Sequence, residues 1–257
     1  MEKSIHKDQV ERFGSILLEI GSLLMSYGAN SMRIRVTLNR IAKAFGYNLE
    51  LLITHRALML HIDDKDDQHS FNQLKRTSPH GVNFRLVSGI SNMSWRIVSE
   101  KWSLDEIEKE IERLKSLPHY PRIIILLLVS LADLSFCRLF GGGMIEMSIA
   151  FGATFVGLFV RQEAVKKTFN PYICIFFASL ASSLISGLAV KFNLGDHPEY
   201  AFATSVLYLI PGVPLVNSFS DIIDGNIMNG IVRGMHGMVI VLSIALGLAL
   251  SLLIYQI

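Results

Sequence analysis

Four charged residues in the second half of the sequence lie inside otherwise apolar segments. They are Asp133, Arg138, Glu146 and Asp221. If these segments cross a bilayer, a charge at the centre costs about 2.5–3.5 kcal/mol on insertion scales, so each is expected to face a cavity or a partner. Arg138 is five residues after Asp133, whereas neighbours on one helix face are three or four apart. Asp133 is therefore a candidate for binding a proton or an amine. A hydrogen bond from a serine or tyrosine of another helix is the structural alternative.

Glu146 follows three consecutive glycines, at positions 141–143, which predict a tight reversal between two apolar segments. Arg138 lies just before this reversal, so one interpretation is an Arg138–Glu146 ion pair that closes the hairpin. The other is that Glu146 shares with Asp133 the binding of protons or of a positively charged group. The spacing leaves both interpretations open.

The strongest local pattern is Leu-Ile-Pro-Gly-Val-Pro-Leu-Val-Asn at positions 209–217. Pro211 and Pro214 remove two backbone donors, and Gly212 adds conformational freedom, so a continuous helix is not expected here. Transporters use such interrupted helices to present backbone groups to a substrate. Asn217 and Asp221 follow the break and add a polar face. The alternative is a simple kink or a re-entrant hairpin packed against protein.

Other patterns that carry chemistry are missing from the sequence. The histidines at positions 55, 61, 69 and 80 lack the spacing of a zinc site, and the glycines at 141–143 lack the lysine of a phosphate-binding loop. No arrangement of serine, histidine and aspartate indicates nucleophilic catalysis. A pI of about 8.5, without a stripe of basic and aromatic residues, argues against nucleic-acid binding. We therefore expect no metal, no cofactor and no enzymatic activity.

The elements that must position these residues divide the chain in two. Residues 1–121 carry 17 Lys and Arg with 15 Asp and Glu, whereas residues 122–257 carry 7 of each. A membrane-crossing helix needs about 20 mostly apolar residues. Five segments meet or approach this length: 122–140, 144–160, 172–190, 201–223 (interrupted by its prolines) and 235–255. We predict an α-helical integral membrane protein with about five transmembrane helices (122–257), preceded by a small α+β cytoplasmic domain (1–121).

The location follows from the N-terminus and from the basic residues. Gly14, Glu19 and Gly21 interrupt the first apolar stretch, and no small-residue cleavage site follows, so no signal peptide is expected. With residues 1–121 in the cytoplasm, most Lys and Arg between the spans fall on the inside, as the positive-inside rule requires. The expected location is the inner (plasma) membrane, with several spans and a cytoplasmic N-terminal domain.

Within residues 1–121, the apolar residues of 8–27 and 32–45 recur at helical spacing, and Asn30 or Ser31 can cap the second helix. Segments 49–54 and 57–62 are predicted strands, with 84–87 as a third. Helices are predicted over 90–99 and 104–117. Ser103 and Glu106 form a capping box at the start of the last one.

Two motifs give the sequence a resemblance to a known family. One is Tyr-Gly-Ala-Asn-Ser-Met-Arg at 27–33. The other, more specific, is Pro-Gly-Val-Pro at 211–214 followed by Asn217 and by Asp-Ile-Ile-Asp-Gly-Asn at 221–226. Over nearly its whole length the sequence resembles the N-terminal part of the threonine/serine exporter family, especially the split form in which this part is a separate chain.

The resemblance implies a subunit of a secondary exporter that moves small hydrophilic metabolites, threonine and serine or a dicarboxylate such as succinate, out of the cell through a broken-helix site. It also implies a small membrane partner subunit of about four to five spans, since the sequence ends after the fifth predicted span; a homo-oligomer is the other arrangement considered. The expected substrate-binding or coupling residues are Asp133, Glu146, Pro211, Gly212, Pro214, Asn217 and Asp221.

A different class of function remains as an alternative. The chain could be a membrane-anchored sensor or scaffold that works through residues 1–121. A pure anchor, however, needs neither the break at 211–214 nor a carboxylate at position 133. These two features favour the exporter.

Overall fold

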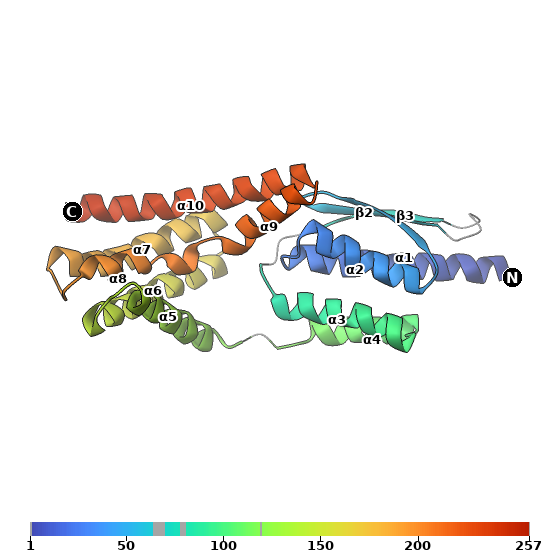
Figure 1. Cartoon of the computed structure of the whole chain (residues 1–257), viewed down its shortest axis with the longest axis horizontal. Coiled ribbons are helices and arrows are strands. Elements are labelled where there is room, and N and C mark those ends of the chain that lie inside the picture. Colours follow the sequence, from blue (N-terminus) through green and yellow to red (C-terminus); the bar gives the residue numbers. More distant parts are fainter. Residues whose placement is uncertain (1, 64–69, 78–80, 119, 257) are drawn as a thin grey trace. The chain divides into compact units, whose positions relative to one another are not determined.

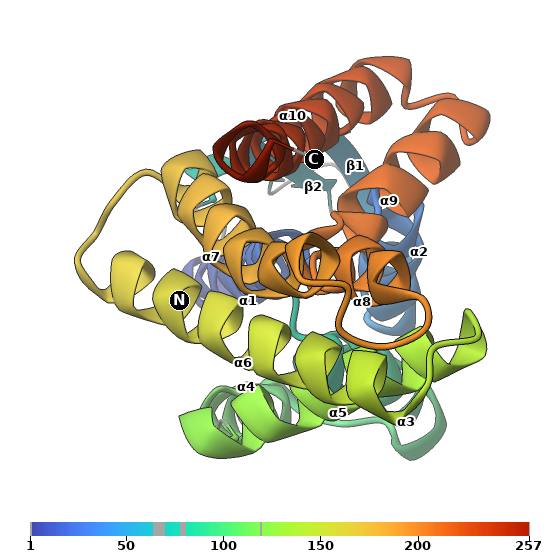
Figure 2. The ribbon, with the colours of Figure 1, turned by 90° about the vertical axis from the view of Figure 1, so that its left-hand side faces the viewer.

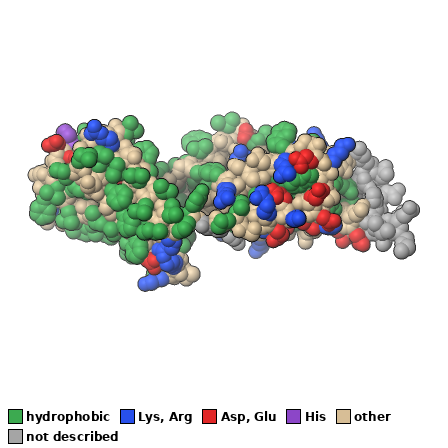
Figure 3. Space-filling view, turned by 90° about the horizontal axis from the view of Figure 1, so that it is seen from below, with side chains coloured by type: hydrophobic (Ala, Val, Ile, Leu, Met, Phe, Trp, Pro, Cys, Tyr) green, Lys and Arg blue, Asp and Glu red, His purple; other side chains and the backbone are tan. Residues whose placement is uncertain are grey.

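The structure, a computed structural model, describes residues 2–63, 70–77, 81–118 and 120–256 (Figure 1). The chain forms two compact units. Unit 1 comprises Met1–Pro118 and Val213–Gly234, and unit 2 comprises His119–Gly212 and Met235–Ile257. In Figure 3, hydrophobic side chains make up much of the visible surface of unit 2, with a few acidic and basic side chains at its edges, whereas acidic and basic side chains are more numerous over unit 1. The segment 213–234, which follows the proline break, thus belongs to the same unit as the N-terminal part of the chain.

Unit 1 combines helices with a small sheet. Its elements are α1 (Glu2–Ser26), α2 (Ser31–Ala44), β1 (Asn48–Ile53), β2 (Ala57–Asp63), β3 (Ser70–Arg76), α3 (Phe84–Glu100), α4 (Leu104–Lys115), most of α9 (Gly212–Ile223) and the first residues of α10 (Ile227–Tyr255). The strands pair antiparallel in the order β1-β2-β3. The helices predicted over 8–27, 32–45 and 104–117 and the first two strands are confirmed. The capping box of Ser103 and Glu106 is confirmed as well.

Glycines let α1 approach the sheet closely. A Cβ atom built on Gly14 would lie 2.3 Å from the ring of Phe71 in β3, and one on Gly21 would lie 2.3 Å from the side chain of Leu58 in β2. The core between α1, α2, α3 and the sheet contains fully buried apolar side chains, including Leu17, Leu38 and Leu58. Burial of such a side chain stabilises the fold by about 1.5–3 kcal/mol.

The third strand predicted over residues 84–87 is wrong, because these residues begin α3. The side chain of Asn83 accepts a hydrogen bond from the backbone N–H of Leu86 and caps the helix. Leu86, Val87 and Ile90 are buried at helical spacing. The actual third strand, β3, is exposed at six of its seven positions. Its sequence therefore carries little of the alternating apolar and polar pattern that predicts strands.

A bidentate ion pair joins α1 to α4 in unit 1. Arg12 donates from Nε to Oε1 of Glu108 at 3.0 Å and from Nη2 to Oε2 at 2.6 Å, and it also contacts Asp105. The hydrogen bonds from Arg12 lower the pKa of Glu108 below its ordinary value and raise the pKa of the guanidinium. The pair is thus formed at neutral pH, and protonation of Glu108 breaks it.

We expect Arg12→Gln to lower the stability of the protein at neutral pH and to have little effect in acid. A carboxylate with a lowered pKa contributes stability above its ordinary pKa of about 4.3, and this contribution is lost as the pH falls through the lowered value. Unfolding midpoints of the purified protein, followed by circular dichroism between about pH 7 and pH 3, test this. The control is Lys109→Gln, which removes an exposed charge that forms no ion pair with a described residue. A difference between Arg12→Gln and the parent protein that is constant with pH would contradict the expectation.

Unit 2 is helical in its described part. It contains α5 (Arg122–Leu139), α6 (Met144–Lys166), α7 (Pro171–Lys191), α8 (Pro198–Thr204), the short 3-10 helix η1 (Leu207–Leu209) and α10 from Met235 onward. Helix α5 packs on α6, α6 on α7, and α8 lies against α5, α6 and α7 (Figure 2). Small residues bring α7 and α10 together. Ser179 donates to the carbonyl oxygen of Ile244 at 2.8 Å, and a Cβ on Gly247 would lie 2.8 Å from Ser179.

Among the described residues, three helices are long and apolar enough to cross a membrane, namely α6, α7 and α10. A fourth crossing is counted if α8, η1 and α9, which are bent at a short break, form one span. Helix α5 coincides with the first predicted span, but it carries three charged residues, Arg122, Asp133 and Arg138. The helical residues of α10 that belong to unit 2 are 235–255. At 1.5 Å per residue they are about 31 Å long, which matches the thickness of the hydrocarbon core of a bilayer.

Candidate functional site

Asp133 lies on the buried face of α5 and is 2% exposed. Its Oδ2 accepts a hydrogen bond of 2.7 Å from Oγ1 of Thr154 in α6. Its Oδ1 is buried and has no hydrogen-bond partner among the described residues, and the same holds for Oγ of Ser130, one turn earlier on α5. Buried polar atoms are nearly always hydrogen-bonded in native proteins, so two unsatisfied oxygens side by side on one helix face indicate a place for a ligand, a proton or water.

Asp133 lines a cavity of about 690 Å³. Most of the wall is apolar and comes from α5, with Phe136 and Phe140, and from η1, with Leu207 and Tyr208. Ile210, the residue before the proline break, also lines the cavity. Among the described residues, Asp133 is the one charged side chain in this wall. Small-molecule sites commonly have this character, with apolar walls and a few polar groups that orient the ligand.

Hydroxyl groups hold the chain before the break onto α6 and α7. Thr154 also donates to the carbonyl oxygen of Ser205, at 3.3 Å, and the hydroxyls of Ser205 and Ser186 lie 3.0 Å apart. The hydroxyl of Tyr208 is 3.1 Å from Oγ of Ser182, which donates to the carbonyl oxygen of Ala153. The sequence does not reveal these residues, because serine and threonine occur in apolar helices both in polar clusters and where helices pack closely, and their spacing does not distinguish the two cases.

The predicted interruption is present. Helix η1 ends at Leu209, residues 210 and 211 are not helical, and α9 begins at Gly212. Pro214 lies in the first turn of α9, where a backbone N–H has no partner within the helix, so a proline is tolerated there. Gly212 does not use the conformational freedom that was expected of it, since its φ is not positive. The two prolines, one at the break and one in the first turn, account for the interruption.

Glu146 lies in the first turn of α6 and is 2% exposed. Its Oε1 accepts a hydrogen bond of 2.9 Å from the backbone N–H of His197. Gly195 has a φ of +95°, and a Cβ there would lie 2.2 Å from Oε1 of Glu146, so this loop is shaped around the carboxylate. Arg138 donates instead to the carbonyl oxygen of Gly142 at 3.3 Å. The Arg138–Glu146 ion pair, one of the two sequence interpretations, is therefore wrong.

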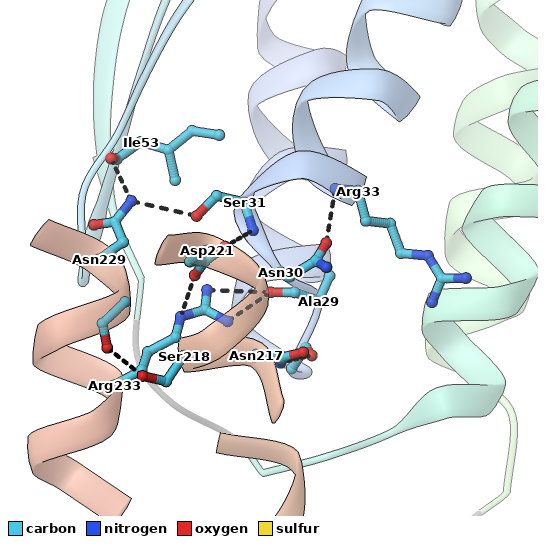
Figure 4. Close-up of polar contacts among 12 residues, drawn as sticks. Ala29, Asn30, Ser31, Arg33, Ile53, Asn217, Ser218, Asp221, Asn229 and Arg233 are labelled. Carbon is cyan, nitrogen blue, oxygen red and sulfur yellow. Dashed lines mark hydrogen bonds and ion pairs between the residues drawn. The ribbon is translucent and has the colours of Figure 1, made fainter. Parts of the chain in front are cut away.

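Asp221 belongs to a second polar cluster, in unit 1, and is fully buried (Figure 4). Its Oδ1 accepts a hydrogen bond of 2.9 Å from the backbone N–H of Ser31, at the start of α2. Its Oδ2 lies 3.2 Å from Nε of Arg233 in α10. Both terminal nitrogens of Arg233 donate to the carbonyl oxygen of Ala29, at 3.2 Å. A carboxylate at the start of a helix is favoured by the helix dipole, and here it also neutralises a buried arginine.

Two asparagines extend this cluster. Asn217 donates to the carbonyl oxygen of Gly28 at 2.8 Å, and Asn229 donates to the carbonyl oxygen of Ile53, at the end of β1, at 2.9 Å. A Cβ on Gly230 would lie 2.7 Å from the carbonyl oxygen of Ser218, so α9 and α10 pack closely there, as the Gly-x-x-x-Gly spacing at 230–234 predicts. The two motifs that carry the family resemblance thus meet in one network.

The expected site residues therefore fall into three surroundings. Asp133 lines the cavity in unit 2, and Pro211 directly follows Ile210, another residue that lines this cavity. Glu146 holds the loop at 195–197. Pro214, Asn217 and Asp221 belong to the hairpin of α9 and α10 in unit 1, together with Arg233 and Asn229, whose roles no spacing revealed. Among the described residues no group of histidine, cysteine or carboxylate side chains could hold a metal ion.

Comparison with known proteins gives a match over almost the whole chain. The family model for threonine/serine exporters matches residues 15–255. A protein of Escherichia coli K12 named as a probable succinate transporter subunit, YjjP, is 28% identical over 93% of both chains, and its Klebsiella aerogenes counterpart is 27% identical over 92% of both. The threonine/serine exporter of Corynebacterium glutamicum is 24% identical over 95% of this chain and 52% of its own length. No solved structure matches.

Proposed function

Because the chain belongs to the threonine/serine exporter family, and is a membrane transporter rather than an enzyme, we propose that it is a subunit of a secondary exporter that moves threonine and serine, or a dicarboxylate such as succinate, out of the cell. The observation that carries this proposal furthest is Asp133, a buried carboxylate with one unpartnered oxygen in a cavity beside a broken helix.

In this proposal Asp133 couples transport to an ion gradient. For threonine or serine, its free oxygen can hold a proton or the ammonium group of the substrate, but not both at once; succinate has no ammonium group, so with succinate only the proton binds to this oxygen. Exclusive binding of two ligands to one group couples their movements, since each lowers the affinity for the other. Tyr208 and the backbone beside Pro211 are the further polar groups that a hydrophilic substrate would meet in the cavity.

Glu146 has a structural role in the same proposal. Its carboxylate is already bound by the backbone of the 195–197 loop, so it is not free to take a proton or substrate without loss of that contact. Asn217 and Asp221 hold the α9–α10 hairpin in unit 1, and we propose that they transmit rearrangements at the break rather than bind the substrate directly.

For the arrangement in the membrane we propose five spans, formed by α5, α6, α7, the α8–α9 segment and α10. The N-terminal domain (1–121) lies on the cytoplasmic side of the inner membrane in this proposal. The charges of α5 are acceptable in a span because Asp133 faces a cavity and Arg122 and Arg138 lie at the two helix ends.

We also propose a small membrane partner subunit of about four to five spans. Two of the relatives are named as subunits, and the Corynebacterium exporter is about twice as long as the part that this chain matches.

Efflux of labelled threonine and succinate from loaded cells tests the proposed function. Cells would express this chain alone, this chain with a small four-to-five-span membrane protein from the same genome, or neither. Efflux above the empty-vector rate in the paired cells supports the proposal and identifies the substrate class. If neither compound nor any other small hydrophilic metabolite leaves faster than from control cells, the sensor or scaffold reading gains support instead.

A further inference from the structure

One end of unit 1 carries exposed apolar side chains beside unpaired arginines. Met32, at the start of α2, is 43% exposed, and Val82 and Phe84, at the start of α3, are 49% and 52% exposed. Arg33 and Arg85 are the exposed neighbours of Met32 and Phe84, and neither forms an ion pair with another described residue. We call these five residues the rim.

The two parts of the rim belong to one end of the unit. The backbone N–H of Asn83 donates to the carbonyl oxygen of Tyr27 at 3.2 Å. Val82 packs beside Gly28, where a Cβ atom would lie 3.4 Å from its Cγ2. The loop before α3 is therefore held against the turn before α2, and their exposed side chains share this end.

The turn before α2 is bound by a residue of α10, a helix that is long and apolar enough to cross a membrane. Arg233 of α10 donates to the carbonyl oxygen of Ala29, in the turn before α2. Arg233 is the seventh residue of α10, whose 29 residues extend about 43 Å at 1.5 Å per residue, so α10 is long enough to cross a hydrocarbon core of about 30 Å and to extend beyond it. The headgroup layer on each side of a bilayer is roughly 5–8 Å thick. If α10 crosses the bilayer with its C-terminal part in the core, the turn that binds Arg233 is expected at headgroup depth.

The charges at this end favour an anionic surface. Segments 27–35 and 81–86 contain Arg33, Arg35 and Arg85 and no acidic residue. Figure 4 shows the side chain of Arg33 pointing away from Asp221, which pairs with Arg233 instead. Basic residues next to a membrane span attract anionic phospholipids, and exposed aromatic and aliphatic side chains enter the interface beside them.

We propose that the rim is a lipid-binding surface: Val82, Phe84 and Met32 enter the interface of the bilayer, and Arg33 and Arg85 bind the phosphates of anionic lipids. This anchors the turn before α2, which holds Asp221 and Arg233, to the membrane surface. It does not depend on which solute is transported.

Tryptophan fluorescence of the full chain in nanodiscs tests the rim. The variant Phe84→Trp, in a background with Trp95→Phe and Trp102→Phe, places a single indole at the rim, and Val82→Trp is a second position in case the first variant fails to fold. The matched control carries Trp95→Phe alone and retains Trp102, which lies at the other end of α3, about 25 Å away along a 17-residue helix.

We expect brominated lipids to quench the indole at position 84 and acrylamide to quench it poorly, with the reverse for Trp102. We also expect the lipid quenching to be greater in discs that contain phosphatidylglycerol than in discs of phosphatidylcholine alone, and Arg33→Gln with Arg85→Gln to remove this difference. An indole that acrylamide quenches as readily as Trp102 would show that the rim faces water. An indole shielded from both quenchers would show that protein covers the rim. Either result overturns the proposal, and equal quenching in both lipids overturns the role of the arginines.

Discussion

Asp133→Asn is expected to reduce gradient-driven efflux by roughly 5- to 150-fold, the range that corresponds to a coupling free energy of about 1–3 kcal/mol. Asparagine has nearly the shape of aspartate and can still accept the hydrogen bond from Thr154, so the packing of α5 on α6 should be preserved. It cannot hold a proton or a full negative charge. The substitution therefore removes the proposed coupling and leaves the fold in place. Efflux from loaded cells with and without an imposed proton gradient measures the effect.

The matched control is Glu146→Gln. Both carboxylates lie on helices of unit 2 and both are 2% exposed, but the carboxylate of Glu146 is bound by the backbone of its own loop. We expect Glu146→Gln to lower thermal stability and to keep the dependence of efflux on the gradient, once the rates are normalised to the amount of folded protein. If Asp133→Asn left this dependence unchanged, Asp133 would not be the coupling residue. If Glu146→Gln abolished it instead, that role would pass to Glu146.

Arg233→Met is expected to destabilise the protein by about 3–5 kcal/mol, the usual result of leaving a buried charge without its partner. Asp221 is fully buried, the side chain of Arg233 is 14% exposed, and methionine fills much of the space of the arginine without its charge. The lost hydrogen bonds to the carbonyl oxygen of Ala29 add to the effect. Chemical denaturation of the purified protein in detergent measures the change in the free energy of unfolding.

A double-mutant cycle separates the ion pair from the loss of packing. Asp221→Asn retains an acceptor for the N–H of Ser31 and removes the negative charge. The protein with both Asp221→Asn and Arg233→Met should therefore be more stable than the sum of the two single effects predicts, because no buried charge is left unpaired. Additive effects would show that the two side chains do not stabilise unit 1 as a pair.

The sequence predicts the features that depend on local chemistry. Two prolines at 211 and 214 are enough to predict the interrupted helix, and Ser103 with Glu106 predicts the start of α4. The cost of a charge among apolar residues singles out Asp133, Arg138, Glu146 and Asp221; the three carboxylates are buried, whereas Arg138 is exposed near the end of α5. These predictions need no knowledge of which elements pack together.

Features that depend on contacts between residues far apart in the chain cannot be predicted from the sequence. Strand β3 forms through its pairing with β2, and its polar residues give no strand signal of their own. The partners of Asp221 are the backbone N–H of Ser31, 190 positions away in the chain, and Arg233, which lies between two predicted spans. The backbone N–H of His197 satisfies Glu146, and no side-chain pattern can reveal a backbone donor. The spacing of residues can therefore identify charged side chains that are costly to bury, but it cannot identify the groups that bind them.

We propose that the chain is part of an exporter of small hydrophilic metabolites and that Asp133 couples this export to a gradient. Efflux from proteoliposomes that contain the purified chain, with and without its membrane partner, tests it most directly. We predict that labelled threonine or succinate leaves these vesicles faster than protein-free vesicles when a proton gradient is imposed, and that Asp133→Asn removes the acceleration. The proposed export would be contradicted if both compounds, and other small hydrophilic metabolites, left the vesicles only at the rate of protein-free vesicles, with and without the partner.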